Sequence, residues 1–164
     1  MAIIFETENF LVQSAESPLV DRRDGGHITI DPKFKIAARQ DLTPQQAIEL
    51  MRLTIVAGEA MTYVMNQHGV DIGRINYQDN GNWSVFKPEG PQLHYHLYGR
   101  AKSATQQKYG QTLYMPHKDE HPEYYAQLQK LTVDDETYIR ARMTEQFKRS
   151  KYSDESWGLK RSNG

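Results

Sequence analysis

One long helix near the middle of the chain constrains the fold more than any other feature. The segment Thr43-Pro44-Gln45-Gln46 offers a threonine that can cap free backbone N–H groups, a proline suited to the first helical position, and a glutamine that completes a capping box. Apolar residues then recur every three or four positions until His68-Gly69, where the helix should end. The expected buried stripe runs through Ile48, Met51, Ile55, Gly58, Thr62 and Met65, with Leu50, Leu53, Ala57, Met61 and Val64 broadening it. Such a helix needs a partner layer on one wide face.

Short strand-like segments precede this helix. Residues 3–5 and 10–13 favour strands and are separated by polar residues, which predicts a hairpin. A glycine pair, Gly25-Gly26, then leads into a third strand at residues 27–30, which Pro32 ends. On that strand His27 should share a face with Thr29.

Further strand-like segments follow the helix. We expect strands at residues 70–78 and 93–98, with a short strand at 83–86 between them. Turn-forming residues at 79–81 and 87–91 separate the three. Strands on both sides of one long helix predict an α+β fold, with an antiparallel sheet of about five strands.

The last sixty residues are expected to add helices. A short helix is predicted at residues 122–130 and a longer one at 134–148, on which Tyr138 or Ile139 would share a face with Met143 and Phe147. We therefore divide the chain into a domain at residues 1–102 and a partly helical extension at 103–164, packed on the same domain. The final seventeen residues carry five basic and two acidic side chains, which predicts a frayed basic tail.

Composition excludes several functional classes. None of the 164 residues is cysteine, so disulfides, zinc–thiolate sites and thiol nucleophiles are ruled out. The formal net charge of −1 gives no broad field for binding duplex nucleic acid. The first residues are acidic and hold only a short apolar run, unlike a signal peptide or a membrane span. We expect a cytoplasmic protein without a membrane partner and without a cofactor.

The strand at residues 93–98 holds the residues with the clearest chemical potential. Strand alternation places Gln92, His94 and His96 on one face, whereas apolar or aromatic residues occupy the other. A third histidine, His27, follows the glycine pair on another strand. Asn76 and Gln78 alternate at the edge of a glycine turn, where their amides could donate hydrogen bonds to an anion.

Together these segments resemble the histidine-triad family of nucleotide hydrolases and transferases. The family signature is His-x-His-x-His followed by two apolar residues, and Gln92-Leu93-His94-Tyr95-His96-Leu97-Tyr98 matches it except that Gln92 stands in place of the first histidine. The resemblance extends over residues 3–100. It includes the segments Gly26-His27-Ile28-Thr29-Ile30-Asp31-Pro32-Lys33, Leu42-Thr43-Pro44 and Tyr77-Gln78-Asp79.

The resemblance implies a role for each site residue. His94 would attack the α-phosphorus of a nucleotide and form a nucleotidyl-histidine, His96 would contact the non-bridging phosphate oxygens, and His27 would orient the cluster from behind. The role of substrate binding would fall to Gln78, Asn76, Ser14 and Glu16, the last two at the ribose. Gln92 can donate a hydrogen bond but cannot transfer a proton to a leaving group. Family members pair through the long helix and an edge strand, which predicts a homodimer.

Two other functions remain open from the residues alone. Gln92 is compatible with a non-catalytic nucleotide-binding module that has lost the chemistry and kept the pocket. Alternatively, His27, His94 and His96 could ligate a metal ion such as Zn²⁺, Fe²⁺ or Mn²⁺. The basic pair Arg22-Arg23 could meet additional phosphates, although a solvated turn whose charges cancel is the simpler interpretation of residues 21–24. The remaining histidines, at positions 68, 117 and 121, are expected at the surface or at helix caps.

Overall fold

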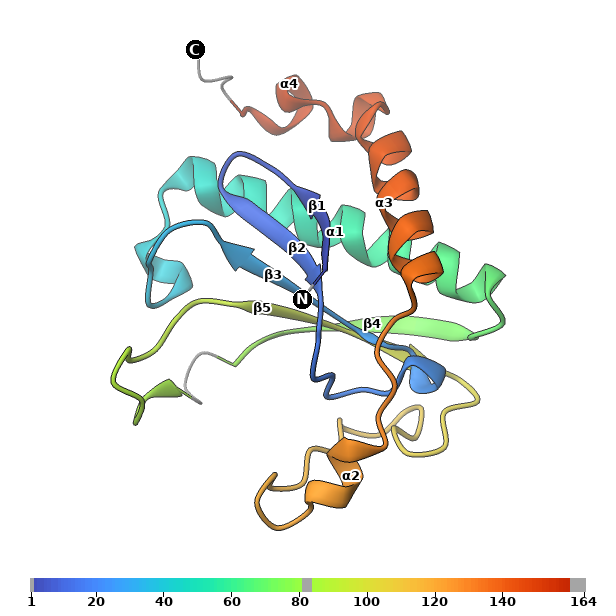
Figure 1. Cartoon of the computed structure of the whole chain (residues 1–164). Helices are drawn as coiled ribbons and strands as arrows, with labels where there is room; N and C mark the ends of the chain where they lie inside the picture. Colours follow the sequence, from blue (N-terminus) through green and yellow to red (C-terminus); the bar gives the residue numbers. More distant parts are fainter. Residues whose placement is uncertain (1, 81–83, 160–164) are drawn as a thin grey trace.

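The computed structural model describes residues 2–80 and 84–159, and its centre is a five-stranded antiparallel sheet (Figure 1). The strands are β1 (Ile3–Glu6), β2 (Phe10–Ser14), β3 (His27–Pro32), β4 (Ile72–Asp79) and β5 (Tyr95–Ala101). Their order across the sheet is β1-β2-β3-β5-β4, and every neighbouring pair is antiparallel. The α+β fold predicted from the sequence is confirmed.

The helices begin at the capping residues that the sequence supplies. In α1 (Pro44–Gln67) the Thr43 side chain accepts from the Gln46 amide, the Gln46 side chain accepts in return from the Thr43 amide, and Pro44 opens the helix. A second capping box at Thr132 starts α3 (Val133–Phe147). Two shorter α-helices are α2 (Pro122–Ala126) and α4 (Asp154–Trp157).

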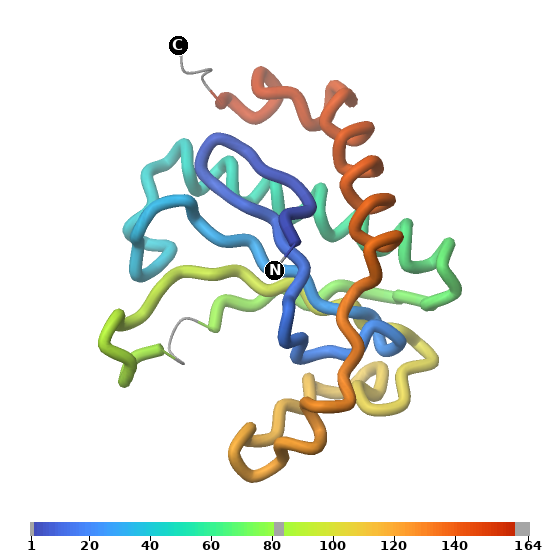
Figure 2. Tube along the Cα trace, in the orientation of Figure 1, coloured from blue at the N-terminus to red at the C-terminus, as the bar shows by residue number. Residues whose placement is uncertain are grey.

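The sheet separates two layers of unlike character. Helices α1 and α3 lie together over one face, and the segment at residues 103–131, yellow to orange in Figure 1, runs along the other side. The tube in Figure 2 shows the same arrangement, with α3 crossing α1. The main core lies between sheet and helices, where Ile28, Leu97, Met61 and Ile139 are fully buried. The face opposite the helices is therefore available for polar residues.

The buried face of α1 is rotated from the predicted one. Met51, placed at the centre of the expected stripe, is 54% exposed, whereas Leu53, Ala57 and Met61 are completely buried. All of the residues expected only to broaden the stripe lie in the core, where Met65 from the expected stripe joins them. When apolar residues cover nearly half the circumference of a helix, the sequence does not show which of them face the core. The elements that pack against the helix decide this.

One predicted strand is wrong. Residues 84–86 form a helical turn rather than a strand, and β4 pairs directly with β5. Position 83, also assigned to that strand, lies outside the described residues. Lys87 donates its amide to the Ser84 carbonyl, so the backbone groups of this segment bond locally instead of joining the sheet.

The turn at residues 21–24 is not solvated as expected. Asp21 and Asp24 are buried, at 2% and 3% exposure. The Asp24 carboxylate accepts hydrogen bonds from three consecutive backbone amides, those of Thr105, Gln106 and Gln107. The turn is thus an anchor for the segment that follows β5, because each buried carboxylate oxygen needs a donor.

Among the described residues, no helix is both long and apolar enough to cross a bilayer.

Candidate functional site

Three histidines meet on the sheet face that points away from α1. His27 belongs to β3, His96 to β5, and His94 lies directly before β5. The antiparallel register sets His27 opposite Tyr98 and Thr29 opposite His96, so these four side chains share one face. Ring centroids are 5.1 Å apart for His27 and His96 and 4.8 Å apart for His94 and His96. The structure brings together the histidines that the sequence placed on two strands.

Hydrogen bonds define which nitrogen of each buried ring carries its proton. The backbone N–H of Leu19 donates to Nδ1 of His27 at 3.2 Å, so this nitrogen accepts. In a neutral ring the proton of His27 is then on Nε2, which donates to Nδ1 of His96 at 2.9 Å. His96 must in turn carry its proton on Nε2, and this buried nitrogen has no partner among the described residues. The Nε2–H group of His96 is therefore a hydrogen-bond donor without a partner among the described residues.

Burial keeps this pair of histidines neutral. It lowers the pKa of His27 well below its ordinary value, and the charges of His96, His94 and Lys118 act in the same direction. Burial, together with His94, lowers the pKa of His96 to about 4. At neutral pH both rings are unprotonated at one nitrogen, as the chain of hydrogen bonds requires.

The proton of the His94 ring lies on Nδ1, whereas that of His96 lies on Nε2. Its Nδ1 lies 2.9 Å from the backbone carbonyl oxygen of Gln92. Because a carbonyl only accepts, Nδ1 carries the proton and Nε2 keeps a free lone pair. The side chain is half-buried, so that lone pair is not sealed in the core. A neutral imidazole with one nitrogen fixed in this way is suited to nucleophilic attack.

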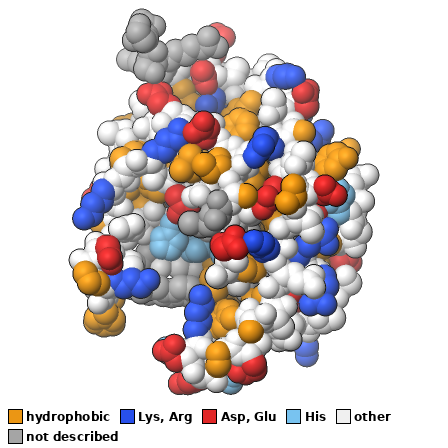
Figure 3. All heavy atoms as spheres, viewed as in Figure 1, with side chains coloured by type: hydrophobic (Ala, Val, Ile, Leu, Met, Phe, Trp, Pro, Cys, Tyr) orange, Lys and Arg blue, Asp and Glu red, His pale blue; other side chains and the backbone are white. Residues whose placement is uncertain are grey.

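A hollow of about 370 Å³ lies beside His27 and His96. Histidine side chains are visible at the surface in Figure 3, with Lys or Arg side chains nearby. The volume is within the range of small-molecule sites. The hollow is lined by Ala15, Glu16, Ser17, Leu19, His27, Thr29, His96 and Lys118.

Three of the predicted binding residues lie on the histidine side. Gln78 is the register partner of His96 on β4, and Asn76 is the partner of Tyr98. The Asn76 side-chain oxygen accepts from Nη1 of Arg100 at 3.1 Å, which leaves its amide nitrogen as the available donor. Glu16 lines the hollow and forms an ion pair with Lys130 at 2.7 Å.

The structure does not bring Ser14 to the histidines. Ser14 is the register partner of Ile28, whose side chain is buried in the core on the helix side of the sheet. Its hydroxyl donates to the Glu136 carboxylate on α3. Gln92 lies before β5 with an exposed side chain, and its carbonyl holds His94.

Two contributors to the site were not predicted from the sequence. Lys118 comes from the segment after β5 and lines the hollow, ninety-one positions along the chain from His27. Leu19 contributes a backbone amide, which no side-chain pattern reveals. Neither residue has a local sequence signal. Lys118 is placed by the packing of the extension, and Leu19 by the turn before β3.

The hypothesis of a metal site conflicts with the hydrogen bonds of His27. Both of its ring nitrogens are engaged, one by Leu19 and the other by His96, so it would have to break a bond to coordinate an ion. Within residues 2–80 and 84–159, no group of three or more His, Asp or Glu side chains is arranged to hold a metal ion.

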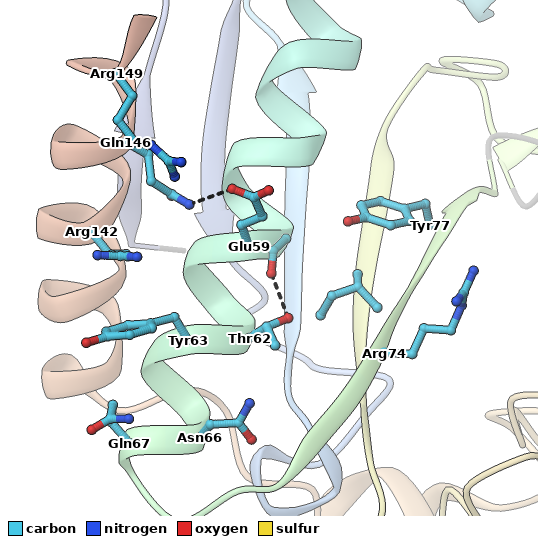
Figure 4. A pocket seen from close by; sticks show the side chains of 12 residues that line it. Glu59, Thr62, Tyr63, Asn66, Gln67, Arg74, Tyr77, Arg142, Gln146 and Arg149 are labelled. Carbon is cyan, nitrogen blue, oxygen red and sulfur yellow. Dashed lines mark hydrogen bonds between the residues drawn. The ribbon is translucent and has the colours of Figure 1, made fainter. Parts of the chain in front are cut away.

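A larger hollow of about 780 Å³ lies away from the histidines, between α1, β4 and α3 (Figure 4). Tyr63 extends from α1 beneath the guanidinium of Arg142, which is 4.1 Å from the ring centroid. Glu59 accepts from Gln146 at 2.9 Å across the two helices, and Tyr77 projects from β4. No part of the histidine cluster lines this groove, so it is a separate surface beside the sheet edge.

Comparison with solved structures identifies the architecture. A hypothetical histidine triad nucleotide-binding protein from Sulfolobus tokodaii superposes with a TM-score of 0.58 at 17% identity, over 92% of this chain and 88% of that one. The chain has the histidine-triad fold. Two further histidine-triad structures agree: a zinc-bound family protein from Mycobacterium smegmatis (TM-score 0.55, 16% identity, 90% and 88% covered) and a Hit-like protein from Bartonella henselae (0.54, 12%, 86% and 85%). No family model and no curated protein matched the sequence.

Proposed function

We propose that this chain is a nucleotide hydrolase or nucleotidyl transferase that acts at the α-phosphate through His94. The substrate type would be a nucleoside phosphoramidate or a dinucleoside polyphosphate. The observation that carries the proposal is the hydrogen bond from His94 Nδ1 to the Gln92 carbonyl, because it leaves the Nε2 lone pair free for attack. The histidine-triad fold gives the same interpretation independent support.

The reaction would proceed in two displacements. In the first, Nε2 of His94 forms a bond to the α-phosphorus while the bond to the leaving group breaks. The unpartnered Nε2–H of His96 would donate to a non-bridging oxygen, and the hydrogen bond from His27 would hold that donor in its tautomer. In the second, water or another acceptor attacks the phosphorus and releases His94.

Gln92 limits the choice of leaving group. The family's first histidine is replaced by an amide, which cannot supply a proton. General acid catalysis is worth roughly 10² to 10⁴ in rate, so a leaving group of high basicity would depart slowly. Substrates whose leaving group is a stable anion, such as a nucleoside polyphosphate, fit this site better.

The second candidate function is a nucleotide-binding module without catalysis, and the exposed amide of Gln92 is the observation that favours it. In such a module the hollow beside His27 and His96 would still accept a nucleotide. His94 would then have no covalent role.

One experiment separates the two functions. The protein is incubated with α-phosphate-labelled dinucleoside polyphosphates of adenosine and guanosine, whose polyphosphate leaving group needs little help from an acid. It is then quenched in alkaline denaturant, because a phosphorus–histidine bond is labile in acid, and separated from free label. His94→Ala is the test variant, and His121→Ala, which changes an exposed histidine before α2, is the matched control.

The proposal expects label on the wild type and on the control variant, with none on His94→Ala. Wild-type protein that stays unlabelled but binds AMP or GMP would support the binding module. Equal labelling of wild type and His94→Ala would show that another group is the nucleophile.

We also propose that two copies pair along β4 and α1. β4 is at the edge of the sheet, and Tyr63 and Tyr77 are about half-exposed on the neighbouring surface. An unpaired edge strand offers backbone donors and acceptors to a second strand. Sedimentation at micromolar concentration should give about twice the 19.0 kDa chain mass. A monomer alone under those conditions would contradict this pairing.

A further inference from the structure

The segment after β5 forms a wall of the histidine site. On the histidine side of the sheet Leu19, Val20 and Tyr98 form a small apolar cluster, and this segment covers it with Leu113, Met115 and Tyr125. These contacts are separate from the main core on the helix side. Residues 103–131 are thus built into the surroundings of His27 and His96.

Polar contacts fix the course of this wall. Asp24 accepts the three amides at residues 105–107, and Arg100 donates to the carbonyls of Lys108 and Gln111. The buried side chain of Gln107 accepts from the Tyr114 amide and donates to the Tyr114 carbonyl. A segment with so many buried partners holds its side chains in a defined place.

Lys118 is the residue that this wall directs to the site. It lines the 370 Å³ hollow together with His27 and His96. Its Nζ is 5.3 Å from the centre of the Tyr125 ring, and the Tyr125 hydroxyl donates to the Pro116 carbonyl at 2.6 Å. Tyr125 therefore fixes the loop and attracts the ammonium at the same point.

The charge of Lys118 is not cancelled by a carboxylate. Among the described residues no Asp or Glu oxygen lies within 4.0 Å of its Nζ. The adjacent Asp119 carboxylate is 92% exposed and lies 4.0 Å from His117. Glu16, on the wall of the same hollow, is paired with Lys130.

An anion that enters the hollow would meet one positive side chain. His27 and His96 are neutral at physiological pH, and Lys118 is the one Lys or Arg among the described residues that line the space. A neutral N–H donor binds a phosphate oxygen more weakly than a charged donor does. The anionic group beside His96 therefore needs the ammonium as its counter-charge.

We propose that Lys118 binds the phosphate of the substrate and makes the site select a nucleotide over the uncharged nucleoside. This inference rests on the proposed function, since it assumes that a nucleotide occupies the histidine site. It adds a substrate-binding residue from outside residues 1–102, the part of the chain that carries the histidine motif. Lys118 acts by binding charge and takes no part in proton transfer.

The test measures affinity with and without the phosphate. Dissociation constants are determined by calorimetry for AMP, GMP, CMP and UMP and for the four matching nucleosides. The variants are Lys118→Met, which keeps an apolar stem over Tyr125, Lys118→Arg, which keeps the charge, and Lys108→Met as the control. Lys108 is an exposed lysine of the same segment whose side chain does not line the hollow. Urea midpoints confirm that every variant is folded.

For the monophosphate that the wild type binds best, we expect Lys118→Met to bind about tenfold or more weakly, with the nucleoside affinity unchanged. The affinity of Lys118→Met for this monophosphate should also depend less steeply on salt concentration than that of the wild type. Lys118→Arg and Lys108→Met should bind nucleotide and nucleoside as the wild type does. Wild-type preference retained in Lys118→Met, or equal losses for nucleotide and nucleoside, would overturn the inference and leave the proposed function standing. A wild type that does not prefer any monophosphate to its nucleoside would overturn both.

Discussion

The buried histidine pair makes the stability of this protein depend on pH in a defined window. In the unfolded chain a histidine takes up its proton near its ordinary pKa of 6.5, whereas burial lowers the pKa of His96 to about 4 in the folded protein. Between these two values the unfolded state binds more protons, so the free energy of unfolding falls as the pH falls. Stability is therefore lost from pH 6.5 downward and levels off below about pH 4.

The size of the effect follows from the two pKa values. For one group with these values, lowering the pH from 7 to 5 costs about 2 kcal/mol of unfolding free energy. His27 has its pKa lowered by burial too, and it contributes in the same direction. In His96→Asn the contribution of His96 disappears while an amide oxygen still accepts from His27. The wild type should therefore lose about 2 kcal/mol more than the variant over this interval.

The assay is urea unfolding at several pH values between 7 and 5, at constant ionic strength and protein concentration. His117→Asn, a change at a histidine whose ring is 66% exposed, serves as the control and should follow the wild type. The comparison uses the change of free energy with pH, so a constant loss of stability in the variant does not affect it. Equal pH dependence in wild type and His96→Asn would refute the reasoning.

Three further predictions concern the anchors and the motif. Asp135→Asn should lower the free energy of unfolding by roughly 2–4 kcal/mol in urea titrations, because this fully buried carboxylate accepts hydrogen bonds from both Arg22 and His68. The control Glu145→Gln, on the exposed surface of α3, should have little effect. Gly25→Ala should destabilise far more than Gly69→Ala: both glycines have positive φ, but a Cβ at Gly25 would lie 2.2 Å from the backbone of the facing strand, and one at Gly69 would meet nothing within 4 Å. A midpoint shift of equal size in the two variants would contradict this close approach. Gln92→His should raise the turnover of substrates with basic amine leaving groups by up to about 10²-fold and leave good leaving groups unaffected, which a series of phosphoramidates measures.

Local signals predicted most of the fold. The capping box at Thr43 gave the start of α1, and the predicted helix at 134–148 matches α3 within one residue at each end. The signals failed where tertiary contacts decide. The turn at residues 21–24 reads as polar and exposed, yet Asp24 is buried because amides eighty positions later bond to it.

Strand parity explains which site residues could be predicted. Alternation along one strand places His96 correctly relative to Leu97, because both belong to a continuous β5. Ser14 and Glu16 were assigned to the ribose by resemblance and not by alternation. They lie on different sides of the sheet, since β2 ends at Ser14 and the chain then turns. Lys118 was beyond the reach of such reasoning, as its position depends on how the extension packs.

The hydrogen bonds from the amides of residues 105–107 to Asp24 link the stability of the sheet to that of the extension. A chain cut after residue 102 would lose the three amides that donate to the Asp24 carboxylate, and Arg100 would lose two carbonyl partners. These contacts lie beside the ends of β3 and β5, the strands that bear His27 and His96. We infer that the extension is not an appendage: residues 1–102 and the extension form one cooperative unit, which is made or lost together.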